Sequence, residues 1–279
     1  MFLNKQATPN DVLINNTNLY KTLKKIIVIL TMGFVLFVSC SKEDGVINNP
    51  ETINPVTNKQ LTGSSSNDLL SDKKFSSMII EVAYVTGFEP SATAINNFVA
   101  FLNARTYKPN GISIVKKAIP STGKATYTIE DIVAIENANR TKFNTSNQIA
   151  VWVFFADGKS SLDTSTAVIL GTAYWNTSLV IYEHTVQGLS DSPLEPNRSL
   201  LETTVITHEL GHILGLTNLG ATLQSNHEDT SHAKHCDVTS CLMYWSSETG
   251  HGISNMVSGG TAPQLDPQCI ADLRANGGK

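Results

Sequence analysis

A pair of histidines at helical spacing constrains this chain more than any other feature. The stretch "HELGHILG" (208–215) holds His208 and His212 four residues apart, with Glu209 directly after the first histidine. Side chains four residues apart lie on the same side of an α-helix, so both imidazoles can bind one metal ion. The fold must therefore fix this helix with its histidines toward a cleft.

The residues around the pair predict a helix with two different sides. We expect it to begin near Pro196 and to run to about Leu216, with Ile206, Leu210 and Ile213 on the side that packs against the sheet. Neutral imidazole is a preferred ligand of Zn²⁺, and a carboxylate beside such a site can accept a proton from water. The sequence thus predicts a Zn²⁺ site in which the glutamate between the histidines is the general base.

The rest of the chain predicts an α/β fold. Five apolar runs indicate strands at 76–85, 111–119, 148–156, 166–174 and 177–184. Apolar residues at helical spacing indicate helices within 95–102, 128–140 and 262–275. Because helices separate the first three strands, we expect a mixed, mostly parallel five-stranded sheet, followed by the active-site helix and a C-terminal helix.

The first 39 residues predict a signal peptide. Lys21, Lys24 and Lys25 precede the apolar run 26–38, whose 13 residues are too few to span a bilayer comfortably. The run ends in "FVSC", which resembles the lipobox of bacterial lipoproteins and implies a lipid on Cys40. We therefore expect an extracytoplasmic protein, anchored by lipid to the outer membrane. An ordinary signal peptide that contains a cysteine is the alternative.

Charge and composition suggest how the remaining chain is organised. Residues 1–39 carry four lysines and one aspartate, so their removal would change the formal charge from −4 to −7, which does not favour nucleic acid as a partner. Residues 40–76 are rich in Asn, Thr, Ser, Pro and Gly, so we expect a flexible tether, with a propeptide as the competing interpretation. Residues 77–279 would form the catalytic domain, which we expect to be monomeric.

Two stretches together resemble the metzincin clan of zinc peptidases: "HELGHILG" and the later "CLMYW" (241–245). The resemblance implies that Gly215 lets the chain turn sharply after the helix and that Met243 forms the methionine turn beneath the metal. It also implies a zinc-dependent endopeptidase acting on protein or peptide substrates. The peptide would pair with the edge strand near Ala167–Ala173.

The third zinc ligand departs from the clan's pattern. Asn218 stands where a typical metzincin has histidine or aspartate, and a neutral carboxamide is a poor zinc ligand. The stretch "HCDVTSCLM" (235–243) resembles the part of archaemetzincins that begins at their third zinc histidine, which implies that His235 is the third ligand. His227 and His232 remain alternatives, because no spacing rule fixes a loop of this length.

Three cysteines follow the predicted lipid anchor. Archaemetzincins carry four cysteines for a second, structural zinc, ending in a Cys-x-x-Cys pair, whereas Cys269 has no partner two residues away. The pattern therefore argues against a second zinc. In an oxidising compartment we expect a Cys236–Cys241 disulfide instead, although three cysteines allow three pairings and Cys269 could take either partner.

Two other interpretations of the sequence stay open. The first is a non-catalytic, surface-binding lipoprotein whose histidines hold a structural metal, although such a site has no need of Glu209 and tends to use four protein ligands. The second is a zinc site whose third ligand is a downstream glutamate, either Glu228 or Glu248.

Overall fold

The computed structural model describes residues 53–193, 195–249, 257 and 260–279. The predicted signal peptide (1–39) and Cys40 lie outside these residues. Within the described part, no helix is both long enough and apolar enough to cross a lipid bilayer.

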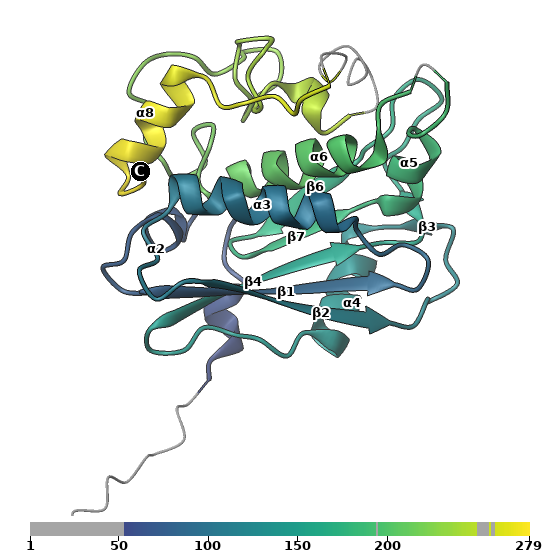
Figure 1. Cartoon of the computed structure of the whole chain (residues 1–279), viewed down its shortest axis with the longest axis horizontal. Helices are drawn as coiled ribbons and strands as arrows, with labels where there is room; N and C mark the ends of the chain where they lie inside the picture. The colour runs from purple at the N-terminus through teal and green to yellow at the C-terminus, as the bar shows by residue number, and fades with distance from the viewer. Residues whose placement is uncertain (1–52, 194, 250–256, 258–259) are drawn as a thin grey trace, which may run out of the picture. The chain divides into compact units, whose positions relative to one another are not determined.

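A five-stranded mixed sheet lies at the centre of the described chain (Figure 1). Its strands are β1 (Ser77–Val85), β2 (Ile112–Ile119), β4 (Gln148–Phe155), β6 (Gly171–Trp175) and β7 (Ser178–Ile181), in the order β2-β1-β4-β7-β6. The pairs β1–β2, β1–β4 and β4–β7 are parallel, while β6 is antiparallel to β7 and forms one edge. The predicted mixed, mostly parallel α/β sheet is thus confirmed.

Helices cover both faces of this sheet. α3 (Ala92–Arg105) and α6 (Arg198–Ile213) lie on one face, and α4 (Ile129–Asn139) lies on the other (Figure 1). Along β4, Val151 and Val153 join the apolar cluster of α3 and α6, whereas Trp152 and Phe154 join that of α4. Successive side chains of a strand point to opposite faces, so a strand covered on both sides is apolar throughout.

Several boundaries differ from those that the sequence predicts. The strand expected at 166–174 begins only at Gly171, and the strand expected at 177–184 ends at Ile181 because α5 (Glu183–Gly188) follows. The C-terminal helix α8 (Pro267–Ala275) begins five residues later than expected, where the side chain of Asp266 accepts a hydrogen bond from the Cys269 amide. Short elements with too few residues to show periodicity were not predicted: β3 (Thr126–Tyr127), β5 (Lys159–Ser160) and η2 (Trp245–Ser247).

The predicted tether is wrong for residues 55–76, while residues 40–52 lie outside the described chain. The segment contains η1 (Pro55–Asn58) and α2 (Ser66–Leu70). Leu69 and Leu70 are fully buried in the main apolar cluster, and the Asn58 side chain donates to the Ala150 carbonyl at 3.0 Å. Composition misleads here because two well-placed leucines and one buried amide are enough to attach a polar segment to the sheet.

This packing predicts a large loss of stability on truncating Leu69. Leu69→Ala should lower the free energy of unfolding by about 2–5 kcal/mol, because it leaves a cavity in the core. Leu61→Ala is the matched control, since Leu61 belongs to the same segment but is 83% exposed; its effect should stay within about 0.5 kcal/mol. Urea denaturation of both variants measures the difference, and equal effects would contradict the packing of this segment.

Candidate metal centre

Helix α6 carries two of the predicted ligands and is itself enclosed. Every residue from Leu201 to Ile213 is buried, and the Asn197 side chain caps the helix by accepting from the Ser199 amide. After the helix, Gly215 has φ +96°, and a Cβ there would lie 2.5 Å from the Ala221 nitrogen, so only glycine fits. The helix is thus held along its length and turned sharply at its end.

Three imidazoles converge above this helix. His208, His212, His235 and Glu248 each offer a ligand atom, and these atoms all lie within 4.8 Å of one another. The Nε2 atoms of His208 and His212 are 3.1 Å apart. Bonds of about 2.0–2.1 Å to a tetrahedral ion would place neighbouring nitrogens ~3.3 Å apart. The structure therefore brings all three predicted histidines together at a spacing that suits zinc.

Backbone carbonyls orient all three rings. In each histidine, Nδ1 lies within hydrogen-bond distance of a carbonyl oxygen, at Leu242 for His208 (2.7 Å), Leu216 for His212 (3.0 Å) and Ala233 for His235 (3.1 Å). A carbonyl can only accept, so Nδ1 carries the hydrogen and a neutral ring turns the lone pair of Nε2 to the centre. This is the arrangement that positions histidines as metal ligands.

When the three rings are neutral, with the hydrogen on Nδ1, their Nε2 atoms carry no hydrogen and cannot donate to one another. Burial, and then the neighbouring His208, lower the pKa of His212 to about 3, so this ring is uncharged at neutral pH. The lone pairs of His208 and His212 consequently face each other, and Nε2 of His235 faces a carboxylate oxygen of Glu248 at 3.2 Å. A cation between the rings would satisfy all three nitrogens, so these residues fit Zn²⁺.

Glu209 lies beside these ligands as a buried carboxylate. It is fully buried, and among the described residues its oxygens make no hydrogen bond of ordinary length and angle, although the backbone amide of Ala173 lies close enough to lower its pKa. Burial, and then the charge of Glu248, raise the pKa of Glu209 well above its ordinary value. The edge strand passes directly over it, because a Cβ on Gly171 would lie 2.8 Å from Oε1 of Glu209. The carboxylate is therefore available to a molecule bound between the edge strand and the imidazoles.

Met243 packs under the histidine pair. Its side chain is fully buried, and a Cβ on Gly211 would lie 2.3 Å from its sulfur atom. Gly211 precedes His212 on α6, so the thioether contacts the helix backbone between the two ligands. The preceding carbonyl, that of Leu242, is the one that orients His208. The role in the turn that the resemblance implied for Met243 stays a prediction.

The alternative ligands fall into two groups. Asn218 is exposed and donates to Glu228 Oε2 at 2.9 Å. The ring of His232 stacks on Trp245, with the ring centroids 4.4 Å apart. Asn218, Glu228 and His232 therefore lie outside the group of imidazoles. Glu248 does belong to it. The sequence suggested Glu248 only as a substitute for His235, and no spacing rule indicated that both would meet at one point.

The predicted Cys236–Cys241 disulfide is absent, since both residues are free thiols in the structure. The sulfur of Cys236 lies 3.5 Å from Nδ1 of His227, and that of Cys241 lies 3.7 Å from the sulfur of Cys269. Zinc bonds of about 2.3 Å to sulfur and ~2.0 Å to nitrogen would give separations of about 3.5–3.8 Å. His227, Cys236, Cys269 and Asp266 form a second group whose ligand atoms all lie within 4.8 Å of one another, and Cys241 adjoins it through Cys269.

Hydrogen bonds around this second group also suit a metal. Cys241 Sγ accepts from the amides of Met243 and Asp266, each at 3.4 Å, which favours a thiolate. The Nε2 atom of His227 lies 2.8 Å from Asp272, so its Nδ1 is the nitrogen left for a ligand bond. Asp266 is also a member of the group, although its Oδ1 accepts from the amide of Cys269 at the start of α8. The sequence missed His227 here because only the folded loop brings it to Cys269.

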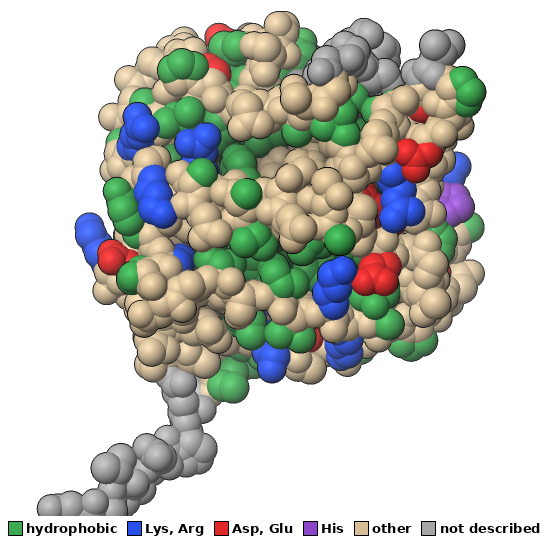
Figure 2. Space-filling model, viewed as in Figure 1, with side chains coloured by type: hydrophobic (Ala, Val, Ile, Leu, Met, Phe, Trp, Pro, Cys, Tyr) green, Lys and Arg blue, Asp and Glu red, His purple; other side chains and the backbone are tan. Residues whose placement is uncertain are grey.

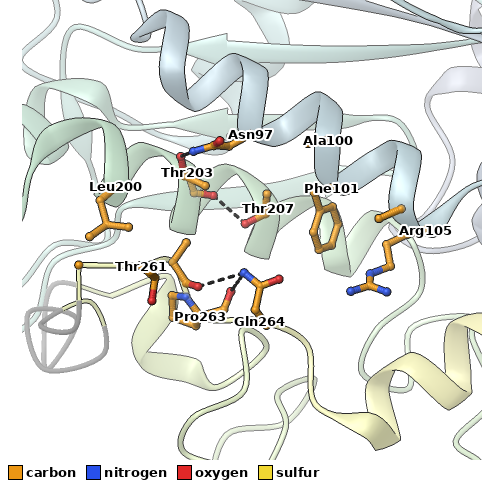
Figure 3. A pocket seen from close by; sticks show the side chains of 13 residues that line it. Asn97, Ala100, Phe101, Arg105, Leu200, Thr203, Thr207, Thr261, Pro263 and Gln264 are labelled. Atoms are coloured by element: carbon orange, nitrogen blue, oxygen red, sulfur yellow. Dashed lines mark hydrogen bonds between the residues drawn. The ribbon is translucent and has the colours of Figure 1, made fainter.

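A separate hollow lies on the other side of α6 (Figure 3). This pocket of about 450 Å³ is bounded by α3, α6 and residues 260–264, and Phe101, Arg105 and Thr207 point toward it. On the face that carries α3, basic and acidic side chains are scattered among apolar and neutral ones (Figure 2). The pocket lining includes neither histidine nor carboxylate, so it is distinct from the metal centre.

Comparisons with known proteins give a loose match. No protein-family model matches the sequence, and no curated protein matches it. Among solved structures, the chain is similar to archaemetzincin from Methanopyrus kandleri, with 16% sequence identity and a TM-score of 0.45, over 72% of this chain and 96% of that chain. A similarity of this size assigns no family, so the metal centre stands on its own geometry.

This geometry predicts that His235 is needed for metal binding and His232 is not. His235→Ala should remove zinc from the histidine centre, because losing one ligand of three lowers zinc affinity by orders of magnitude. His232→Ala is the control, since its ring is 41% exposed and bonds to Asp229. Elemental analysis of zinc per chain distinguishes them. Equal zinc content in the two variants would contradict the ligand assignment.

Proposed function

We propose that the chain is a zinc-dependent endopeptidase. One observation carries the proposal: the buried carboxylate of Glu209, with both oxygens unpartnered, lies next to three imidazoles whose Nε2 atoms converge. Burying an unpaired carboxyl group costs folding free energy, and such groups are concentrated at functional sites. A metal, a water molecule and a general base are the components of metal-assisted peptide hydrolysis.

The residues of the centre have separate tasks in this mechanism. His208, His212 and His235 would hold Zn²⁺, which when bound polarises the scissile carbonyl and lowers the pKa of a water molecule. Glu209 would accept a proton from that water and deliver it to the departing amine. The edge strand β6 would pair with the backbone of the peptide and so align its scissile bond with the imidazoles.

The test of this mechanism is Glu209→Gln. The amide cannot accept the proton, so turnover should fall by about two to four orders of magnitude while zinc content stays unchanged. Casein in its unfolded form is a suitable substrate, with zinc measured in parallel. Glu130→Gln, on the exposed first turn of α4, is the control and should cleave like the native protein. Full activity in Glu209→Gln would refute the role of the base.

A second candidate function is metal-dependent binding without catalysis. The observation that favours it is Glu248, which supplies a fourth protein ligand atom beside the three imidazoles, as structural zinc sites do. In that case the protein would bind zinc fully, and neither the native chain nor Glu209→Gln would hydrolyse any peptide.

We also propose a second, structural zinc bound by His227, Cys236, Cys241 and Cys269. The Cys236–His227 and Cys241–Cys269 separations of 3.5 Å and 3.7 Å support it, and the Cys269–His227 separation of 4.0 Å joins the two pairs. Such an ion would tie the loop before His235 to helix α8. The free energy of zinc binding to the thiolates adds to the free energy of folding, because the site forms only in the folded chain. The ion would therefore stabilise the domain, as a disulfide would.

Cys269→Ser tests the structural ion. Zinc content should fall from two ions per chain to one, and the midpoint of thermal unfolding should fall with it. Ser231→Ala, an exposed change in the same loop region, should retain both ions. A native chain that contains one zinc and a disulfide, as shown by thiol titration, would refute this site.

The cellular setting stays part of the proposal. A lipid on Cys40 would hold the domain on the outer membrane, where protein or peptide substrates reach it. We propose that it acts there as a monomer.

A further inference from the structure

Glu248 lies at the mouth of the metal centre. Its side chain is 24% exposed, whereas that of His208 is fully buried. One carboxylate oxygen lies 3.2 Å from Nε2 of His235, and the other lies 3.7 Å and 3.8 Å from Nε2 of His208 and His212. Ligands about 2.0–2.2 Å from a tetrahedral ion are ~3.2–3.6 Å apart. The carboxylate thus stands close to where a fourth ligand would.

The backbone of Glu248 is attached to the edge of the sheet. Its carbonyl accepts from the Leu170 amide at 2.8 Å, and Thr249 forms an antiparallel bridge with Ile169. Residues 169 and 170 lead directly into β6, which begins at Gly171 over Glu209. A peptide that added itself to this edge would need the same backbone groups. Residues 248–249 therefore occupy one end of the surface along which a peptide would lie.

Glu248 lies where it would close the metal centre and the strand edge, whereas a peptidase needs both to be open to substrate. Four protein ligands are typical of a structural zinc site, whereas a catalytic site keeps one position open. Glu209, buried and without a partner, has no task in a site that stays closed. A fourth ligand that leaves when a substrate arrives is compatible with both observations.

We propose that Glu248 is a displaceable fourth ligand, which closes the metal centre until a peptide takes over its coordination position and its backbone partner. This inference rests on the proposed peptidase function. The ligand that would displace it is a carbonyl or another oxygen donor on an extended peptide, since a peptide can match both the metal position and the strand edge.

Glu248→Gln tests the proposal, because the amide keeps the shape of the side chain but is a poor zinc ligand. Two properties of the purified, zinc-loaded chain are measured: the rate at which a chelator removes zinc, and the affinity for acetohydroxamate, a small oxygen donor that needs no peptide subsites. The single variant His235→Ala measures the background, which is zinc bound elsewhere in the chain. Glu130→Gln is the matched control.

The proposal predicts changes in opposite directions. Zinc should leave Glu248→Gln about tenfold faster or more, because a ligand is lost. Acetohydroxamate should nevertheless bind ~10-fold more tightly or better, because a position that Glu248 closes in most native molecules becomes open in nearly all. Cleavage of casein should rise with it. Glu130→Gln should match the native protein in all three measurements.

Three results would overturn the proposal, and they are distinguishable. Unchanged zinc release and unchanged acetohydroxamate affinity would mean that Glu248 is not a ligand, while the Glu209→Gln test would still stand. Faster zinc release without tighter acetohydroxamate binding would mean a fixed, structural ligand. A native chain with no zinc at the histidines would refute both this inference and the proposed function.

Discussion

Three backbone carbonyls determine what the centre of this protein can do. Those of Leu242, Leu216 and Ala233 fix the Nδ1 hydrogens and so turn three lone pairs toward one point. Each carbonyl comes from a different piece of chain: the turn at Met243, the end of helix α6 and the loop before His235. The conformation of the surrounding loops therefore determines where these carbonyl oxygens lie. A displaced loop would leave an imidazole in the wrong tautomer as well as in the wrong place.

The two groups of candidate metal ligands share one segment of the chain. His235 belongs to the first group and Cys236 to the second, and the Cys236 amide donates to the carbonyl of Met243 at 2.8 Å. His227 lies opposite on the same ribbon, where its carbonyl accepts from the Asp237 amide at 2.9 Å. The second group is thus attached to the loop segment that carries His235. Its contribution to the first group is mechanical, through the backbone, because no ligand is common to both.

What the sequence predicts well depends on local spacing. The histidine pair, the capping residues Thr128 and Asp131, and the apolar strand β4 are each readable from neighbours a few residues apart, and the structure contains all three. The parts that failed depend on distant contacts. The segment predicted as a tether is packed, because Leu69 belongs to the apolar core. The cysteine predicted to form a disulfide, Cys236, instead lies beside His227 as a free thiol. Spacing cannot indicate which residues a long loop brings together.

The contact between Gly211 and Met243 has a consequence for relatives of this chain. A Cβ at position 211 would lie 2.3 Å from the methionine sulfur, so the two sites share one volume. A homologue with alanine at 211 would need a shorter side chain at 243, and one that keeps methionine would need glycine. The two positions should therefore change together during divergence, even where the surrounding loops have lost all resemblance.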